Sequence, residues 1–253
     1  TLSLHDALPI LPSDTALEAQ NLCFSYGKEP ALHEISMTVH SGESVGLIGA
    51  NGAGKSTLLR LLVGLEEGYS GSLTVCGLPV EKRNYPKLRA AVGYVFQDSD
   101  SQLFMTTVLE DAAFAPRSYG LPDAEQRALE ALEQVHIAHL RDKSIYRLSG
   151  GEKKLASIAT ILSMTPELLL MDEPSGALDP GNRRNLIHII NRLDQTKLIA
   201  SHDLDFIWDT CSRCILLSKG CLAADGPTEV LLRDEALLCQ NGLELPLSLQ
   251  RRN

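Results

Sequence analysis

The sequence contains little that would bind nucleic acid or cross a membrane. Lys and Arg total 23 against 32 Asp and Glu, which gives a formal net charge of −9, and no long run of basic residues occurs. Because binding to nucleic-acid phosphates requires a basic surface, we expect no nucleic-acid partner. The longest uncharged helical stretch, residues 155–166, is shorter than the roughly 18 apolar residues that a membrane span needs. We therefore expect a globular chain that does not cross a membrane by itself.

The sequence also lacks the pattern of a zinc site or of a disulfide framework. Among its six cysteines only Cys211 and Cys214 form a C-x-x-C pair, with no second pair or histidine pair nearby to complete a tetrahedral site. A chain of 253 residues, 44% of them hydrophobic, can build a core without disulfides. We expect reduced thiols and favour ordinary packing of this pair over zinc binding or redox chemistry.

The N-terminal residues do not resemble the rest of the chain. The sequence starts at Thr1 without Met, and residues 1–10 match one reading frame of a common sequencing-adapter oligonucleotide. We expect residues 1–13 to be a non-native leader and assign no function to His5 or Asp6.

A glycine-rich loop is the strongest chemical signal in the sequence. Residues 49–57 read Gly-Ala-Asn-Gly-Ala-Gly-Lys-Ser-Thr, between the apolar run 44–48 and the apolar run 58–62. This order of strand, glycine loop and helix is typical of a phosphate-binding loop, in which backbone N–H groups and the helix N-terminus surround phosphates. Lys55 adds a full positive charge, and Ser56 offers a hydroxyl to Mg²⁺. The residues that we expect to bind the nucleotide here are Asn51, Gly52, Ala53, Gly54, Lys55, Ser56 and Thr57.

The residues before this loop predict an antiparallel β layer. Residues 16–24 and 31–40 alternate between apolar and polar, and a turn around Tyr26 separates them. Residues 41–43 indicate a hairpin-like turn into the strand before the phosphate loop. The ring of Tyr26 could stack on adenine, although tyrosines in turns are commonly structural.

Between residues 98 and 165 the pattern changes to helices. The spacing of apolar residues predicts helices over 108–114 and 123–135 and a short one over 137–140. The segment closes at Leu148-Ser149-Gly150-Gly151-Glu152, a second glycine loop before a predicted helix over 153–162. We interpret it as a helical insertion in a β core, ending at a helix N-terminus suited to an anion.

Polar residues then follow short apolar runs that we predict to be strands, so they lie at the carboxyl ends of those strands. The run 92–96 leads to Gln97, the run 168–171 to Asp172 and Glu173, and the run 198–200 to His202. Parallel sheets place their ligands at this edge. Two carboxylates there suit support of Mg²⁺ and activation of a hydrolytic water, although a strand-capping pair is the plainer interpretation. The amide of Gln97 could bind Mg²⁺ through its oxygen and contact the attacking water as a catalytic residue, but a single Gln or His is a weak signal by itself.

Taken in order, these segments resemble the ATP-binding cassette (ABC) ATPases over about residues 16–246. The resemblance implies an α/β fold: a P-loop NTPase (RecA-like) core with an antiparallel β subdomain and an inserted α-helical subdomain. It implies ATP hydrolysis, with ATP and Mg²⁺ as cofactors. We expect residues 14–97 and 166–232 to form a nucleotide-binding core. Residues 98–165 would form a helical subdomain that carries the family's signature motif, the second glycine loop at 148–152. Residues 233–253 would be a C-terminal extension.

The resemblance also implies roles within one nucleotide site. Tyr26 would stack on adenine, and Lys55 would hold the β- and γ-phosphates. Ser56 and Gln97 would bind Mg²⁺, and Asp172 would support the metal.

Hydrolysis would involve further residues and a second subunit. By the same resemblance, Glu173 would act as general base or polarise the attacking water, and His202 would contact the γ-phosphate. Ser149, Gly150 and Gly151 would close on the ATP of a second subunit, with Asp179 at the dimer seam. Because the chain holds one copy of each motif, a homodimer or a heterodimer with a related ABC ATPase is implied.

Three segments resemble the ATPases of energy-coupling factor (ECF) and cobalt/nickel importers. They are residues 98–104, similar to D-x-D-x-Q-L-F, residues 108–114, similar to V-x-E-D-V-A-F, and the less specific tail 241–246, similar to G-L-x-x-P. After the Leu-Ser-Gly-Gly signature motif, Glu152 occupies the position where the family often has Gln. Lys154 and Leu155 occur where an Arg usually follows. We expect these changes to tune affinity, since no catalytic group is lost.

We expect an ATPase that powers uptake of a transition-metal ion, cobalt above nickel. Its partners would be a transmembrane coupling subunit and a substrate-binding membrane subunit, and it would lie peripherally on the cytoplasmic face of the cell membrane. A shared ECF ATPase for vitamin uptake is the alternative, because another polypeptide selects the substrate. A non-transport ABC ATPase of DNA repair or translation is disfavoured, since residues 55–149 contain no sustained heptads and the chain has one cassette.

Overall fold

The structure is a computed structural model that describes residues 14–176 and 178–250. The expected non-native leader, residues 1–13, lies outside the described residues, as do Ala177 and the last three residues of the expected C-terminal extension.

One sheet forms the antiparallel layer expected before the phosphate loop, with strand order β2-β1-β4-β5. Its strands are β1 (Thr15–Tyr26), β2 (Glu29–His40), β4 (Ser70–Val75) and β5 (Leu78–Pro79). The alternating apolar residues of β1 and β2, such as Leu22 and Ile35, are buried in one cluster with Leu58 and Leu62. This layer therefore packs against the helix that follows the phosphate loop.

The second sheet carries the phosphate loop at its centre, with strand order β10-β9-β3-β8-β7-β6. Its strands are β3 (Ser44–Ile48), β6 (Val92–Val95), β7 (Leu168–Asp172), β8 (Thr196–Ala200), β9 (Arg213–Ser218) and β10 (Cys221–Pro227). All neighbouring pairs are parallel except β10 with β9. Every residue of β6, β7 and β8 is buried, as continuous apolar runs in a sheet covered on both faces require.

The turn at residues 41–43 differs from the sequence prediction. We expected a hairpin-like turn, but β2 and β3 lie in different sheets, so this prediction was wrong. The alternating pattern of β2 suits a sheet with one buried face, whereas β3 is apolar throughout and pairs in parallel with β8 and β9. The chain therefore crosses from one sheet to the other at this turn.

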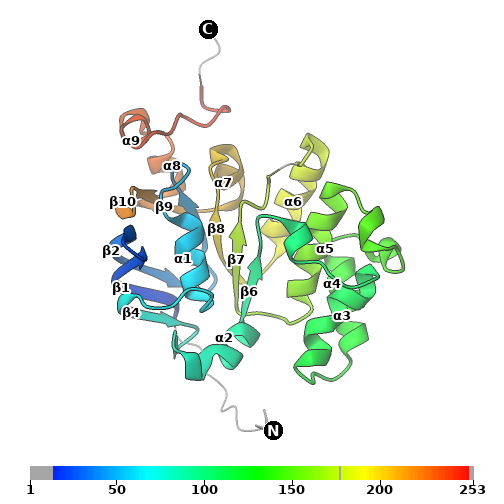
Figure 1. Cartoon of the computed structure of the whole chain (residues 1–253). Helices are drawn as coiled ribbons and strands as arrows, with labels where there is room; N and C mark the ends of the chain where they lie inside the picture. The colour runs from blue at the N-terminus through cyan, green and yellow to red at the C-terminus, as the bar shows by residue number, and fades with distance from the viewer. Residues whose placement is uncertain (1–13, 177, 251–253) are drawn as a thin grey trace.

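Helices cover the second sheet and extend beyond one side of it (Figure 1). They are α1 (Lys55–Leu62), α2 (Tyr85–Ala91), α3 (Val108–Ser118), α4 (Ala124–Gln134), α5 (Gly150–Leu162), α6 (Pro180–Arg192), α7 (Leu204–Thr210), α8 (Thr228–Leu231) and α9 (Glu235–Gln240). One-turn helices occur at Lys82–Asn84, Ser99–Ser101, Ala138–Leu140 and Ile145–Arg147. Helices α3, α4 and α5 pack together as a lobe beside β6, in green in Figure 1.

Helix α5 begins earlier than the sequence indicates. Gly150 and Gly151 form its first turn instead of a loop. The Glu152 N–H donates to Ser149 Oγ at 3.3 Å, and the Ser149 N–H donates to Glu152 Oε2 at 2.7 Å, which is a capping box. Lys143 Nζ also lies 3.0 Å from Glu152 Oε2. The carboxylate at position 152 thus stabilises the helix start.

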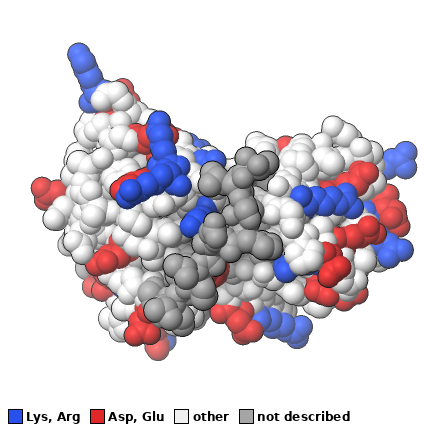
Figure 2. Space-filling view, turned by 90° about the horizontal axis from the view of Figure 1, so that it is seen from below, with Lys and Arg blue, Asp and Glu red and all other residues white. Residues whose placement is uncertain are grey.

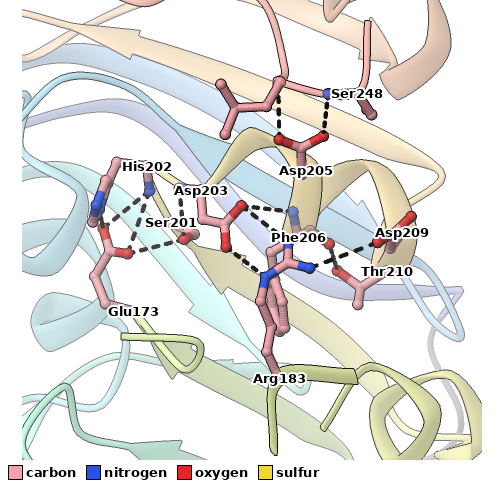
Figure 3. A network of polar contacts seen from close by, with 11 residues as sticks. Glu173, Arg183, Ser201, His202, Asp203, Asp205, Phe206, Asp209, Thr210 and Ser248 are labelled. Atoms are coloured by element: carbon pink, nitrogen blue, oxygen red, sulfur yellow. Dashed lines mark hydrogen bonds and ion pairs between the residues drawn. The ribbon is translucent and has the colours of Figure 1, made fainter. Parts of the chain in front are cut away.

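The C-terminal tail packs against α7. The N–H groups of Leu247 and Ser248 donate to the two carboxylate oxygens of Asp205 at 2.8 and 3.0 Å (Figure 3). Residues 243–247 line a groove together with residues 202–205. The tail segment with importer resemblance therefore lies beside the loop that carries His202.

The Cys211 and Cys214 pair lies inside the main core of the described chain. Both side chains are buried, and burial raises the pKa of Cys211 to about 11 and that of Cys214 to about 12. Because the thiolate is the reactive form and the metal ligand, this environment favours inert packing.

None of the helices in the described part of the chain combines the length and apolar character of a membrane span. On the face shown in Figure 2, Lys and Arg side chains alternate with Asp and Glu over both lobes instead of forming one basic patch.

Candidate functional site

A cavity of about 840 Å³ opens where the parallel strands end, next to the phosphate loop. Its walls come from the β1–β2 turn, the phosphate loop and α1, the ends of β6, β7 and β8, and the β9–β10 turn. The lining residues are Tyr26, Glu29, Pro30, Ala31, Asn51, Gly52, Ala53, Gly54, Lys55, Ser56, Thr57, Gln97, Glu173, His202, Lys219 and Gly220. The fold therefore brings together predicted site residues from five separate segments.

Three glycines give the phosphate loop its shape. Gly49, Gly52 and Gly54 have φ values of +152°, +78° and +104°, which other residues rarely adopt. A Cβ atom on Gly49 would collide with the backbone carbonyl oxygen of Leu217. The loop can wrap around phosphate groups because these positions carry no side chain.

Replacement of Gly49 by Ala should therefore destabilise the fold as well as the site. We expect a loss of about 1–3 kcal/mol in the free energy of unfolding, because the new methyl group meets the backbone of β9. Chemical denaturation measures this loss. Gly52→Ala is the matched control, since no atom lies within 4 Å of a Cβ there and only the left-handed backbone resists the change. Equal losses in the two variants would contradict the assigned contact.

Lys55 is buried at the base of the cavity, with 7% of its surface exposed. Its Nζ donates to the carbonyl oxygens of Gly49 at 2.7 Å and Ala50 at 3.2 Å, and lies 4.0 Å from Glu173 Oε1. Burial lowers the pKa of the ammonium group, while the charges of Glu173 and Asp172 oppose that shift. A phosphate bound in the loop would carry the full negative charge that pairs best with this ammonium group, whereas the two carbonyl oxygens carry only partial charge.

Ser56 and Asp172 form an oxygen-rich pair below the cavity. Ser56 Oγ donates to Asp172 Oδ1 at 3.0 Å, and the hydroxyl of Tyr94 donates to Oδ2 at 3.3 Å. Burial raises the pKa of Asp172, and these two hydrogen bonds oppose that shift. Hydroxyl and carboxylate oxygens are ligands that Mg²⁺ accepts, so the pair fits this ion.

The rest of the Mg²⁺ coordination would come from elsewhere. Within residues 14–176 and 178–250, no group of three or more His, Cys, Asp or Glu side chains could enclose a metal ion. In nucleotide sites Mg²⁺ commonly keeps waters and binds substrate phosphates besides one or two protein oxygens. The donor set here therefore suits a metal that arrives with a nucleotide.

Glu173 follows Asp172 directly and is held by the end of β8 (Figure 3). Its Oε2 accepts a hydrogen bond from Ser201 Oγ at 2.9 Å, and its Oε1 accepts one from the His202 N–H at 3.1 Å. Nδ1 of His202 lies 2.9 Å from Oε1. Glu173 also has a φ of +46°, a left-handed backbone that costs a non-glycine residue about 1–2 kcal/mol. The surrounding contacts thus fix one orientation of this carboxylate.

Tyr26 and Gln97 both line the cavity. Tyr26 is 43% exposed, its ring meets Phe24 edge-on at 4.9 Å, and its hydroxyl donates to Glu66 Oε1 at 3.1 Å. One face of this ring is thus available to a planar ligand. Gln97 is exposed, and its backbone oxygen accepts a hydrogen bond from the buried Lys154 Nζ at 2.8 Å. Lys154 therefore ties the end of β6 to helix α5.

The signature residues lie apart from this cavity. Ser149, Gly150 and Gly151 do not occur among the residues that line it, although Ser149 and Gly150 are exposed at the start of α5. The nucleotide cavity of a single chain is therefore formed without them.

Five residues of the cavity wall were not predicted from the sequence. Glu29, Pro30 and Ala31 enter from the start of β2, and Lys219 and Gly220 from the β9–β10 turn. The Gly220 N–H donates to the Ala53 oxygen at 3.1 Å, a contact across more than half of the chain. The Lys-Gly dipeptide signals a turn in the sequence, but only the pairing of β9 with β3 brings that turn to the phosphate loop.

The sequence is similar to those of known proteins. The family model described as ABC transporter matches residues 32–176. A Geobacter sulfurreducens protein, named as an ABC transporter ATP-binding protein, is 48% identical over 238 residues, which are 92% of this chain and 95% of that protein. The Methanothermobacter thermautotrophicus protein named energy-coupling factor transporter ATP-binding protein EcfA is 41% identical over 238 residues, covering 91% and 76%.

Solved structures share the fold. The structure of cbiO1 from Clostridium perfringens, described as part of the ABC transporter complex cbiONQ, matches with a TM-score of 0.81 at 32% identity, covering 92% of this chain and 97% of that one. A nucleotide-free ATP-binding cassette matches with a TM-score of 0.78 at 24% identity, which supports the fold alone. The predicted P-loop fold is thus confirmed. The chain belongs to the ABC transporter ATP-binding family: it is the ATPase subunit of a transporter, and its cofactors are ATP and Mg²⁺.

Proposed function

We propose that this ATPase powers an importer of a transition-metal ion, cobalt above nickel, through separate membrane subunits. The 32% identity to cbiO1, described as part of the cbiONQ complex, supports a metal importer. The 41% identity to EcfA supports the alternative, a shared energy-coupling ATPase for vitamin uptake.

The observation that carries the proposal is an exposed aromatic pair in the helical lobe. The two segments with strongest importer resemblance, 98–104 and 108–114, meet at Asp111, whose Oδ2 accepts the N–H groups of Phe104 and Met105 at 3.1 and 3.0 Å. Phe104 is 61% exposed and Phe114 is 42% exposed, with their rings edge-on at 4.8 Å. Exposed aromatic pairs on a rigid support mark binding surfaces, and we assign this one to a membrane-subunit helix.

The geometry supports a distinct role for each site residue. We assign Tyr26 to adenine, the residues 51–57 to the phosphates, and Ser56, Gln97 and Asp172 to Mg²⁺. Bound Mg²⁺ would neutralise phosphate charge. Glu173 is suited to accept a proton from a hydrolytic water, and the His202 side chain, 61% exposed beside it, to contact the γ-phosphate.

The functional unit in this proposal is a dimer on the cytoplasmic face of the membrane. Ser149, Gly150 and Gly151 lie outside the cavity of their own chain and would cover the ATP of a second subunit, either a copy of this chain or a related ATPase. Residues 14–97 and 166–232 would act as the nucleotide-binding core, residues 98–165 as the subdomain that contacts the membrane partner, and residues 233–253 as a C-terminal extension.

Substitution of both aromatic residues tests the assignment. Co-expressed with the membrane proteins encoded beside its gene, the Phe104→Ser, Phe114→Ser double variant should lose co-purification and membrane-stimulated ATP hydrolysis by about 10-fold or more, because truncated aromatic anchors cost about 2 kcal/mol or more. Tyr146→Ser is the control, an 84% exposed aromatic residue elsewhere in the lobe. Co-purification of the double variant at the control's level would overturn the assigned surface, and a vitamin-binding membrane protein encoded beside the gene would overturn the metal substrate.

A further inference from the structure

Asp203 is the centre of a polar network next to Ser201, His202 and Glu173 (Figure 3). Its Oδ2 accepts a hydrogen bond from Arg183 Nε at 2.9 Å, and its Oδ1 accepts one from Arg183 Nη2 at 3.1 Å. Oδ1 also accepts the Phe206 N–H at 2.9 Å, which caps helix α7. Two-point pairing of this kind fixes the orientation of both groups, not only their separation.

The carboxylate of Asp203 stays ionised in this setting. Burial raises its pKa, but the hydrogen bonds from Arg183 and the Phe206 N–H, with the charge of Arg183, outweigh burial and lower the pKa below its usual value. The pairing with Arg183 is therefore a charged contact in a half-buried place, where such contacts are stronger than on the open surface.

The network leads from Asp203 to Glu173 in two steps. The Asp203 N–H donates to Ser201 Oγ at 3.1 Å, and the same hydroxyl donates to Glu173 Oε2 at 2.9 Å. Ser201 is fully buried, so no solvent competes for this hydroxyl. The loop 201–203 thus holds Glu173 at one end and is held by Arg183 at the other.

Arg183 belongs to the first turn of α6, on the side of the expected dimer seam. Its N–H donates to the Asp179 oxygen at 2.9 Å, and Asp179 Oδ1 caps the helix by accepting the Gly181 and Asn182 N–H groups at 2.9 and 3.0 Å. The guanidinium also lies over the Phe206 ring, 5.6 Å from its centre. Arg183 does not occur among the residues that line the nucleotide cavity. Within its own chain it can therefore affect the nucleotide site only through other residues.

We propose that Arg183 is a positioning residue for hydrolysis: by holding Asp203 it keeps the loop 201–203 in the geometry that orients Glu173, and it links that geometry to the Asp179 turn. This inference rests on the proposed role of Glu173 and on the proposed dimer. It predicts that loss of the guanidinium lowers turnover without weakening ATP binding, because the residue touches neither phosphates nor adenine.

The test uses Arg183→Met with Arg213→Met as the matched control. Arg213 makes the same two-point contact, with Asp225 at 2.7 and 2.7 Å, and its side chain is 23% exposed against 24% for Arg183. It begins β9 and contacts β10, however, away from Glu173. Thermal unfolding, ATP affinity and kcat are measured for each variant, with kcat taken well below the lower Tm.

We expect both variants to lose stability and only Arg183→Met to lose kcat, by about 10-fold or more, since small misplacements of reacting groups have effects of this size. ATP affinity should stay within about 2-fold, and Arg183→Lys should restore kcat only in part, because a lysine cannot make the two-point contact. Unchanged kcat in Arg183→Met, or equal losses of kcat in both variants, would overturn the inference.

A second comparison separates this inference from the proposed function. In a Glu173→Gln background, Arg183→Met should cause no further loss, because its effect passes through the carboxylate. Full hydrolysis by Glu173→Gln alone would overturn the role of Glu173 and the inference with it. Loss of hydrolysis in Glu173→Gln together with a full additional loss from Arg183→Met would overturn the inference alone.

Discussion

Glu173→Gln is expected to bind ATP normally and to hydrolyse it about 10² times more slowly or worse, the usual scale of a lost general base. The amide keeps the size of the side chain and can still accept the hydrogen bond from Ser201, so the loop 201–203 should hold its place. What is lost is the basic oxygen that faces the cavity beside His202. ATP that is bound but not hydrolysed should also hold the two subunits together.

Three measurements check this expectation: phosphate release, binding of a fluorescent ATP analogue, and the elution volume with and without Mg-ATP. Glu167→Gln is the control, since it makes the same change of charge on an exposed residue just before the opposite end of β7. Turnover of Glu173→Gln close to that of Glu167→Gln would show that another group activates the water. A variant that is slow but stays monomeric with ATP would leave the base in place and contradict the dimer.

Lys55→Met is expected to weaken ATP binding by about 10- to 100-fold, because a hydrogen bond to a charged group is worth about 1.5–3 kcal/mol. The methionine fills a similar volume but cannot donate to a phosphate. Stability without ATP should change little, because relief of the desolvation cost that lowers the pKa of the buried ammonium offsets the loss of two carbonyl contacts and of the charge contact with Glu173 at 4.0 Å. Loss of affinity with retained stability is the signature of a binding residue.

Calorimetry of ATP binding and thermal unfolding without nucleotide measure the two effects of Lys55→Met. Lys219→Met is the matched control: Lys219 lines the same cavity and carries the same charge, but it is exposed on the β9–β10 turn. Solvent screening makes its contribution small. If Lys219→Met weakened binding as much as Lys55→Met, the effect would follow net charge in the cavity and not the phosphate loop.

The sequence alone identifies the phosphate loop because its chemistry is local. Strand, glycines, lysine and hydroxyl occur within residues 44–62, and each is fixed by backbone conformation or by the helix start. The same holds for the strand ends, since continuous apolar runs predict buried strands and the next residue must lie at the sheet edge. Asp172, Glu173, Gln97 and His202 could therefore be placed near one another before any coordinates.

The predictions from the sequence were wrong or incomplete where a feature depends on residues far apart in the chain. Residues 41–43 have the composition of a hairpin turn, yet β3 pairs with β8 and β9, more than 140 positions away in the chain. Gly150 and Gly151 have loop composition, yet the capping box of Ser149 and Glu152 includes them in α5. Glu152 looked like a departure that tunes affinity, and its visible contribution is to the helix start.

By itself the sequence determined the fold family and the nucleotide, and it identified the candidate reacting groups, because these depend on short segments with fixed local geometry. Only the tertiary structure decided which residues complete the cavity wall, that Ser149 lies outside it, and that Arg183 reaches Glu173 through Asp203 and Ser201. Arg183 lies 20 positions from Asp203, and Ser201 lies 28 positions from Glu173. They meet because α6 packs against α7 and β7 pairs with β8, and such contacts between elements depend on packing that no local pattern contains.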